Sequence, residues 1–386
     1  MIYFDNAATS YPKPKQLMRA YTEYLSFYGA NPGRAGHDMS LKTAEQVYKT
    51  REAVAELLGA FAPENVVFTQ NCTHSLNIVL KGLLQSGDHV VISDLEHNSV
   101  LRPVYKLWQG SFVDYTIASV TEGDDDATVE SFKEAMRPNT KLIACTHGSN
   151  AFGIKLPVAR LAQLAHKYGA FLLADCAQTA GTEPINMMDM GIDYLAAPGH
   201  KGLYGPTGTG VLLVSPNAPV LKTIAEGGTG SNSMEYTQPD FLPDMLESGT
   251  VNTAGIIALG AGISAIKLKG TDNISRQELL LAQQLYDGIQ KINGAVLYTK
   301  RPSAKYHLPV LSFNMDNEHS EETAKQLNGY DVAVRAGLHC APLAHKKMGT
   351  LQKGTVRLSL GMFNTEKDVE EFLTILKLLK INGYKH

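Results

Sequence analysis

The sequence has few cysteines, and their spacing excludes two kinds of site. There are only four, Cys72, Cys145, Cys176 and Cys340, widely scattered and without a CxxC pair. Neither a zinc site nor a disulfide framework is therefore indicated. A cysteine with a special role in this chain has to act alone, and we expect no metal.

Excess charge and long apolar runs are also missing. The formal net charge is only −3, which gives no reason to expect nucleic acid or an anionic membrane as a partner. No apolar run reaches the ~18 residues that a membrane span needs, and the start of the chain lacks the basic segment and apolar core of a secretory signal. We therefore expect a cytoplasmic protein that acts on small molecules.

The length predicts two unequal domains. With 386 residues the chain is longer than the ~250–300 residues at which single cores stop growing. The content of 44% hydrophobic and 19% charged residues is typical of a folded globular protein. No internal repeat or low-complexity tract interrupts it.

The middle of the chain alternates short apolar runs with amphipathic helical stretches, which predicts an α/β domain with a mostly parallel sheet. The runs are NVVFT (65–69), HVVIS (89–93), KLIACT (141–146), AFLLAD (170–175), IDYLAA (192–197) and TGVLLV (209–214). Beyond about residue 260 a helical stretch (276–292), a strand (309–315) and an amphipathic helix (366–382) predict a smaller α+β domain. We place the large domain at 15–260 and the smaller one at 1–14 together with 261–386.

Polar residues follow most of the apolar runs, at 70–74, 94–98, 147–150, 175–178 and 198–201. Ligands of open α/β sheets bind beyond the carboxyl ends of the strands. The sequence therefore predicts that an acid, a lysine, several histidines and amides gather at one edge of one sheet.

Lys201 is the candidate attachment point for an aldehyde cofactor, because such a group is held by an amine as a Schiff base. Taken alone, a His-Lys pair in a glycine-rich segment is more often a surface turn. Asp175, at the end of an earlier apolar run, makes a cofactor-binding lysine the better interpretation. The ring nitrogen of pyridoxal phosphate (PLP) must stay protonated, and a partly buried carboxylate favours that protonated form. Gln178 follows three residues later, within reach of the phenolic oxygen of the ring.

A phosphate group needs hydrogen-bond donors, and the turn before SLNIVLKGLL has the pattern of a helix start, where free N–H groups attract an anion. Thr73 and His74 are the candidate contacts, and a plain helix cap is an equal alternative. His97 follows another strand, where an imidazole can stack on the ring and move protons. An ordinary loop histidine is the alternative there.

The chain resembles the class V aminotransferases, PLP enzymes of fold type I, and within them the cysteine desulfurases and selenocysteine lyases. The similarity covers nearly the whole chain. It is carried by YFDNAATS at the start, NPGRAGH at 31, EHNS at 96, SNAFG at 149, LADCAQ at 173, GHKGLYGPTGTG at 199, ESGTVNTAGI at 247, RAGLHCAP at 335 and VRLSLGMFNT at 356.

The resemblance implies a role for each matching residue. Lys201 would be the Schiff-base lysine, Asp175 the partner of the ring nitrogen, Gln178 the contact of the phenolic oxygen, and His97 the ring-stacking acid and base. Thr73, His74 and His200 would hold the phosphate, and Thr250 would reach the phosphate of the neighbouring subunit of a homodimer. Asn150 would contact the cofactor or the substrate carboxylate, Arg357 would clamp that carboxylate, and Asn6 and Ala7 would border the substrate.

Cys340 occupies the position of the nucleophile in the resemblance, which implies transfer of sulfur from L-cysteine to Cys340 as a persulfide, with L-alanine as the other product. Its RxGxHC loop is closest to the branch of the Suf-system desulfurase and selenocysteine lyase. Cys145 and Cys176 lie in apolar runs and are expected to be inert. Cys72 is the rival, because a helix N-terminus lowers a thiol pKa. His339 or Arg335 is expected to activate Cys340 by adjacency.

Two departures from the family pattern leave questions open. Pro198 stands where many relatives carry a phosphate-binding serine, and APLAHKKMGT after Cys340 matches no familiar branch. The preferred substrate, L-cysteine or L-selenocysteine, and any sulfur-acceptor protein stay open. Another class V aminotransferase, a C–S lyase without a persulfide, and a non-catalytic scaffold are the alternatives, although a scaffold would be expected to have lost Lys201, Asp175 or Arg357.

Overall fold

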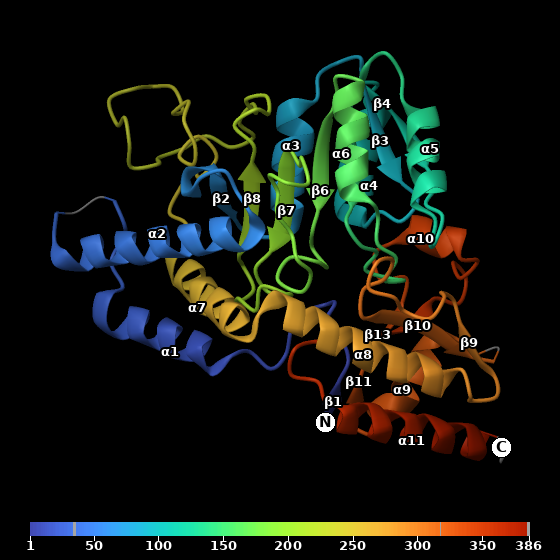
Figure 1. Cartoon of the computed structure of the whole chain (residues 1–386). Coiled ribbons are helices and arrows are strands. Elements are labelled where there is room, and N and C mark those ends of the chain that lie inside the picture. Colours follow the sequence, from blue (N-terminus) through green and yellow to red (C-terminus); the bar gives the residue numbers. More distant parts are fainter. Residues whose placement is uncertain (34–35, 317, 384–386) are drawn as a thin grey trace.

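Seven short strands form one central sheet, in the order β2-β8-β7-β6-β5-β3-β4 (Figure 1). This is a computed structural model, and it describes residues 1–33, 36–316 and 318–383. The strands are β2 (Val66–Thr69), β3 (Asp88–Ser93), β4 (Val113–Ala118), β5 (Thr140–Thr146), β6 (Phe171–Asp175), β7 (Tyr194–Pro198) and β8 (Gly210–Val214). Arg34 and Ala35 of the NPGRAGH motif lie outside the described residues.

The sheet is parallel except for β8, which runs antiparallel to both of its neighbours, β2 and β7. The other six strands therefore end at the same edge, and this edge carries the polar segments that follow them. The expected α/β fold with a mostly parallel seven-stranded sheet is confirmed.

Helices cover both faces of the sheet, because successive strand residues point to opposite sides. Val91 and Ile143 belong to the core on one face, whereas Val90 and Leu142 belong to the core on the other. The first face is covered by α2 (Asp38–Leu58), α5 (Asp125–Ala135), α6 (Val158–Lys167) and α7 (Thr253–Lys269), and the second by α3 (Cys72–Leu83) and α4 (Asn98–Gln109). Helix α1 (Lys15–Glu23), the π-helical turn Tyr24–Tyr28 and the 3-10 turn Pro63–Asn65 complete this part.

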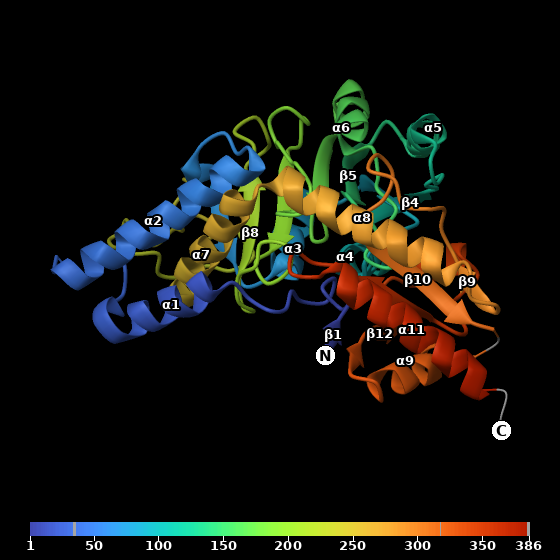
Figure 2. The same ribbon diagram turned by 60° about the horizontal axis from the view of Figure 1, so that its bottom comes forward.

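The last third of the chain builds a second, antiparallel sheet in the order β12-β13-β10-β9. Its strands are β9 (Ala295–Leu297), β10 (Val310–Met315), β12 (Arg335–Gly337) and β13 (Thr355–Ser359), and its helices are α8 (Thr271–Ile289), α9 (Ser320–Asn328), α10 (Pro342–Lys347) and α11 (Glu366–Gly383). Figure 2 shows α8 running from the end of α7 to β9.

The N-terminal segment forms a separate two-stranded sheet and then reaches the second sheet. Strand β1 (Ile2–Tyr3) pairs in parallel with β11 (Val332–Ala333), and Asp5 forms a bridge to Ser359. Phe4 packs against Phe372 of α11, with their ring centroids 5.6 Å apart. The segment around residue 5 is thereby fixed between the two sheets.

No single helix in the described part of the chain is long and apolar enough to cross a membrane. The bent pair of α7 and α8, with 77° between them, passes the same criterion by length and composition only.

Candidate active site

A cavity of about 170 Å³ lies at the edge where the parallel strands end. It is lined by seven of the residues singled out in the sequence: Thr73, His97, Asn150, Asp175, Gln178, His200 and Lys201. Pro198, Cys72 and Ser99 complete much of its wall. The prediction that these residues meet at one sheet edge is therefore confirmed.

Lys201 follows β7 and is enclosed in this cavity. Burial lowers the pKa of its amine to about 8, while the nearby Asp175 carboxylate acts in the opposite direction. An amine with this pKa is partly unprotonated near neutral pH, as attack on an aldehyde requires. Lys201 thus has the environment of a reactive amine.

Asp175 ends β6 and is 3% exposed. Its Oδ1 accepts hydrogen bonds from the Ala177 N–H at 2.9 Å and from the Cys72 thiol at 3.4 Å. A buried carboxylate with so few donors favours a positive charge placed beside it. This is the electrostatic setting that a protonated pyridine nitrogen needs.

His97 is the N-cap of α4. Its Nδ1 accepts from the Ser99 N–H at 3.0 Å, and therefore the neutral ring carries its proton on Nε2. Burial lowers the pKa of the imidazole. His97 is a neutral ring with one N–H to offer.

The N-terminus of α3 presents free N–H groups and the Thr73 hydroxyl at the cavity. Asn71 caps it by accepting from the His74 N–H at 2.9 Å, which leaves the N–H groups of Cys72 and Thr73 without an intrahelical acceptor. The Thr73 hydroxyl lies 2.7 Å from that of Ser99. Thr73 therefore faces the Lys201 cavity.

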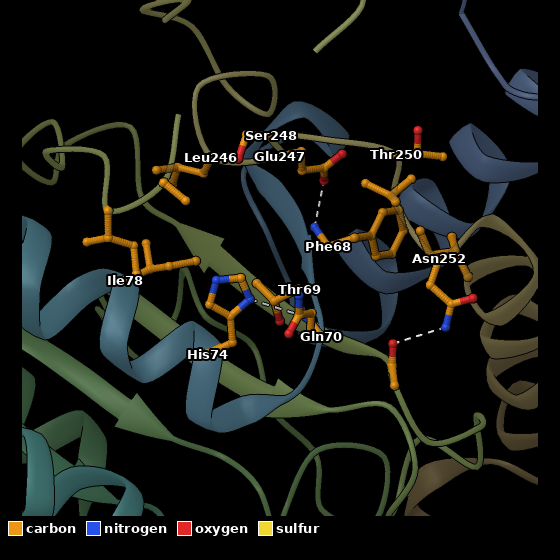
Figure 3. A pocket seen from close by; sticks show the side chains of 15 residues that line it. Phe68, Thr69, Gln70, His74, Ile78, Leu246, Glu247, Ser248, Thr250 and Asn252 are labelled. Carbon is orange, nitrogen blue, oxygen red and sulfur yellow. Dashed lines mark hydrogen bonds between the residues drawn. The ribbon is translucent and has the colours of Figure 1, made fainter. Parts of the chain in front are cut away.

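His74 does not line this cavity. Its imidazole accepts from the Gln70 N–H at 3.4 Å and lines a separate cavity of about 270 Å³, which also contains Thr250 (Figure 3). Successive helix residues point about 100° apart, so Thr73 and His74 cannot both face Lys201. His74 and the exposed Thr250 therefore line a different cavity from Lys201 in this chain, and the phosphate contact expected of His74 stays a prediction.

His200 and Asn150 each present an unpartnered polar atom. Burial lowers the pKa of His200 to about 4, with Lys201 and Lys13 acting in the same direction, so its ring is neutral. Among the described residues neither the His200 Nδ1 nor the Asn150 Oδ1 has a hydrogen-bond partner, although both are buried. Buried polar atoms are rarely left unpaired unless a ligand or water completes them.

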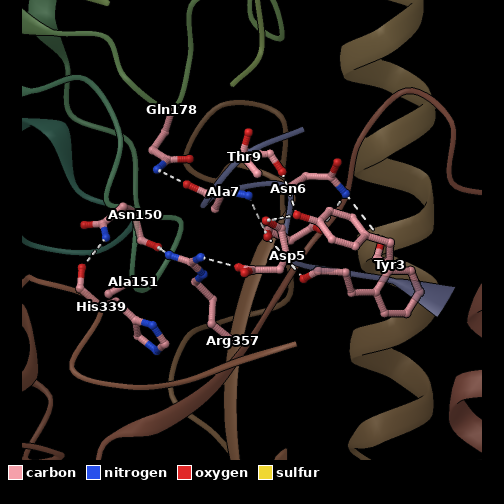
Figure 4. Close-up of polar contacts among 12 residues, drawn as sticks. Tyr3, Asp5, Asn6, Ala7, Thr9, Asn150, Ala151, Gln178, His339 and Arg357 are labelled. Atoms are coloured by element: carbon pink, nitrogen blue, oxygen red, sulfur yellow. Dashed lines mark hydrogen bonds and ion pairs between the residues drawn. The ribbon is translucent and has the colours of Figure 1, made fainter. Parts of the chain in front are cut away.

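Arg357 on β13 is buried and held from two sides (Figure 4). One terminal nitrogen donates to Asp5 Oδ1 at 2.7 Å and the other to the Asn150 main-chain oxygen at 3.0 Å, whereas its Nε has no partner among the described residues. Asp5 stands in the YFDNAATS motif, but nothing in the sequence marks it as a partner of Arg357. The guanidinium is fixed in place, but only part of its fork is available to a carboxylate.

The two residues expected to border the substrate do not line this cavity. Asn6 and Ala7 line a smaller cavity of about 30 Å³ that Lys201 also borders. The Asn6 amide donates to the Ser359 carbonyl at 3.1 Å, and the Ala7 carbonyl accepts from Gln178 Nε2 at 3.1 Å. Their contacts hold Gln178 and the N-terminal segment in place.

Cys340 is the exposed cysteine, while Cys72, Cys145 and Cys176 are buried. Burial raises the pKa of each buried thiol, and at Cys72 the neighbouring Asp175 raises it further. The rival interpretation, in which the helix N-terminus activates Cys72, is therefore disfavoured, because desolvation and the adjacent carboxylate outweigh the helix dipole.

The Cys340 loop is bound to both sides of the cavity mouth. The Cys340 carbonyl accepts from the Asn98 N–H at 2.8 Å, next to His97, and the His339 carbonyl accepts from Asn150 Nδ2 at 2.7 Å. His339 and Cys340 both have left-handed backbone conformations, with φ of 49° and 56°. Residues other than glycine rarely adopt this backbone conformation, so two of them in succession indicate a constrained loop.

His339 does not supply the positive charge expected beside Cys340. Its ring is buried, with Nε2 3.1 Å from the Thr355 carbonyl oxygen, and burial lowers its pKa to about 2. Arg335 is near enough to lower the pKa of both His97 and Lys201. Of the two expected neighbours, only Arg335 provides a cation.

These features fit PLP: a part-buried amine, a buried carboxylate, a neutral imidazole and helix N–H groups line one cavity. Together with the seven-stranded sheet they define a PLP enzyme of fold type I. In the described residues no group of three potential ligands is arranged to hold a metal ion.

The chain belongs to the aminotransferase class-V family, whose model matches residues 2–372. Members of this family depend on PLP. A probable cysteine desulfurase of Methanothermobacter thermautotrophicus is 35% identical, over 96% of this chain and 92% of that protein. A cysteine desulfurase of Haloferax volcanii is 32% identical, over 97% and 88% of the respective chains. The apo structure of a cysteine desulfurase from Thermococcus onnurineus superposes with a TM-score of 0.89 at 34% identity, and covers 98% of this chain and 94% of that one.

Proposed function

We propose that this chain is a cysteine desulfurase that converts L-cysteine to L-alanine and takes the sulfur on Cys340. The observation that carries the proposal is the position of Cys340. It is exposed, and its loop is bound to the first residue of α4 and to Asn150 at the mouth of the Lys201 cavity. The full-length similarity to cysteine desulfurases supports the same reaction.

PLP, when bound, supplies an aldehyde that links to amines and a protonated ring that withdraws electrons from the substrate carbon. Lys201 would hold the aldehyde carbon through Nζ, Asp175 would face the ring nitrogen, and Gln178 would face the phenolic oxygen. Thr73, with the first N–H groups of α3, and His200 would bind the phosphate. His74 is not assigned a contact within its own chain.

Some residues around the cofactor would transfer protons, and others would bind the substrate. Lys201, with a pKa of about 8, accepts and returns a proton at the substrate carbon once its amine is free. His97 would offer its Nε2–H within the cofactor cavity. Arg357 would orient the substrate carboxylate by donating its unpartnered Nε–H, and Asn150 Oδ1 would accept a hydrogen bond from an N–H or O–H group of the cofactor or substrate.

Cys340 would act as a thiolate on the substrate sulfur. An S–S bond forms while the C–S bond of the substrate breaks, and the electron pair of that bond leaves with the carbon fragment, which gains protons and becomes alanine. The product on the protein is a persulfide.

The assembly around this reaction is also proposed. ESGTVNT places Thr250 at a cavity that lacks Lys201, which fits a homodimer in which Thr250 reaches the phosphate of the partner's site. The large domain is proposed at 15–260 and the smaller one at 1–14 and 261–386, with a cytoplasmic location and a sulfur-acceptor protein.

The test is product formation by the PLP-loaded wild type. L-cysteine should give alanine and, with a thiol reductant, sulfide in equal amounts, and L-selenocysteine assayed in parallel shows which amino acid is preferred. Alanine without any protein persulfide would favour a C–S lyase, and no alanine from either amino acid would contradict the proposal.

A further inference from the structure

The main-chain carbonyl oxygen of His200, directly before Lys201, is held by the N-terminal segment. It accepts from the Ser10 N–H at 3.1 Å, from the Thr9 hydroxyl at 3.0 Å and from the Lys13 ammonium group at 2.7 Å. The Ser10 hydroxyl accepts from Lys13 Nζ at 2.8 Å and donates to the Lys201 carbonyl at 2.9 Å. Two consecutive carbonyl groups are therefore fixed by residues that lie 187 to 191 positions earlier in the sequence.

The turn that carries Lys201, between β7 and β8, has few hydrogen bonds of its own. The Tyr204 N–H donates to the Lys201 carbonyl at 2.8 Å. The Gly205 N–H donates to the Gly199 carbonyl at 2.7 Å. Among the described residues, the His200 carbonyl accepts only from the N-terminal segment. Because main-chain carbonyl groups need partners, the conformation of this turn depends on that segment.

Lys13 is the charged member of this set of contacts. It is partly buried, and its bonds go to a hydroxyl and a carbonyl oxygen, with no carboxylate partner among the described residues. Burial lowers the pKa of its amine to about 8. Removing a charge from water without a counter-ion opposes folding, whereas a neutral donor bonds a carbonyl at a smaller desolvation cost. Folding stability alone therefore favours a neutral residue at this position.

We propose that Lys13 is a positioning residue of the active site, whose ammonium group fixes the main chain of His200 and Lys201. A charged donor makes a stronger hydrogen bond to a carbonyl oxygen than a neutral donor does. Reactive groups have to be held within roughly 0.5 Å of their working position, and Lys201 lies in a turn instead of a strand or helix. The inference rests on the proposed function only in taking Lys201 as the residue that links PLP.

The charge of Lys13 also acts on the side chain of His200. Burial is the main cause that lowers the pKa of this ring to about 4, and Lys201 and Lys13 lower it further. The His200 ring is therefore neutral, with a buried Nδ1 that has no partner among the described residues. Lys13 thus contributes to two properties of the segment before Lys201, the position of its main chain and the charge of its imidazole.

The first test measures how firmly the turn is held. Lys13→Met removes the donor and the charge but keeps an unbranched side chain. In the full chain, both loaded with PLP and depleted of it, amide hydrogen exchange of Tyr204 and Gly205 should become about tenfold faster, as followed by mass spectrometry. The matched control Lys15→Met removes an exposed lysine of the same segment and should exchange like wild type. An unchanged exchange rate in Lys13→Met overturns the proposal.

The second test measures the reaction of Lys201 with PLP. After PLP is added to the depleted chain, the borohydride-reducible adduct at Lys201 should form about tenfold more slowly in Lys13→Met than in wild type. Lys13→Gln keeps a neutral donor and should give an intermediate rate, and Lys13→Arg keeps the charge and should restore the rate. Lys15→Met should react like wild type.

A wild-type rate of adduct formation in Lys13→Met or in Lys13→Gln overturns the proposal, and so does a slow rate that Lys13→Arg fails to restore. Neither readout uses L-cysteine. A chain that forms the adduct but leaves L-cysteine unconverted contradicts the proposed function alone. An adduct at another lysine contradicts the proposed role of Lys201, and amide exchange then still decides whether Lys13 holds the turn.

Discussion

At the scale of single residues, burial sets the chemistry of this site more than neighbouring charges do. Burial is the largest cause of the shifted pKa of Lys201, His97 and Cys72 alike. It gives a reactive amine at Lys201 and a neutral ring at His97, and it makes Cys72 a poor nucleophile. Residue types alone predict which groups meet, whereas the degree of burial decides which of them react.

The effect of burial on a pKa can be measured at Glu96, next to His97, as a change in the free energy of unfolding with pH. Its carboxyl group is fully buried, Oε1 accepts from the Thr146 N–H at 2.9 Å, and burial raises its pKa from 4.5 to about 8. Between those values the folded state binds a proton that the unfolded state has lost. The free energy of unfolding therefore falls as pH rises through this window.

Glu96→Gln should remove that part of the pH dependence. From pH 5 to pH 8 the wild type should lose ~2–5 kcal/mol more unfolding free energy than the variant, measured by denaturant titration at both values. Glu130→Gln on α5, which changes an exposed acid, serves as the control and should behave like wild type. Parallel pH profiles for wild type and Glu96→Gln would show that Glu96 is ionised in the folded protein.

At the scale of elements, the sequence predicts the buried apolar strands well. It predicts poorly in which direction a strand runs. All six predicted strands of the large sheet form. Strand β4 is missing from the prediction because it lies at the sheet edge, where its residues 114–117 are partly or fully exposed. Strand β8 runs antiparallel to its partners β2 and β7. The direction of a strand depends on its partners, and the local sequence pattern does not indicate it.

Helix orientation and contacts between distant residues explain why the sequence does not show which residues of the site lie together. Thr73 and His74 are adjacent in the sequence, yet the turn of α3 directs them into different cavities. The bond between Arg357 and Asp5 joins residues that are 352 positions apart. Such contacts follow from tertiary packing, which spacing alone does not reveal.

At the scale of the whole molecule, the site is assembled from both sheets. Lys201 and Asp175 come from the large sheet, while Arg357 and the Cys340 loop come from the second one, and the N-terminal segment joins the two through Asp5. The cavity around His74 and Thr250 has no reactive amine of its own. In the proposed homodimer, those residues would lie at the partner's site.

Thr250→Ala tests this assembly. Loss of a hydrogen bond to a charged phosphate, ~1.5–3 kcal/mol, should weaken PLP binding about ten- to a hundredfold, measured by equilibrium dialysis. The dimer and the unfolding transition should persist. The control Thr237→Ala changes another exposed threonine of the same loop and should retain PLP normally. A fully active monomer in sedimentation experiments would refute the shared site.

The most direct test of the central claim follows sulfur onto Cys340. Cys340→Ser and Cys72→Ser are prepared with PLP, given L-cysteine, and assayed for alanine and, by mass spectrometry, for a protein persulfide. Cys340→Ser should bind PLP but lose almost all alanine and persulfide formation, whereas Cys72→Ser should keep both, because its thiol is buried beside Asp175. Alanine and persulfide at wild-type rates in Cys340→Ser would contradict the account.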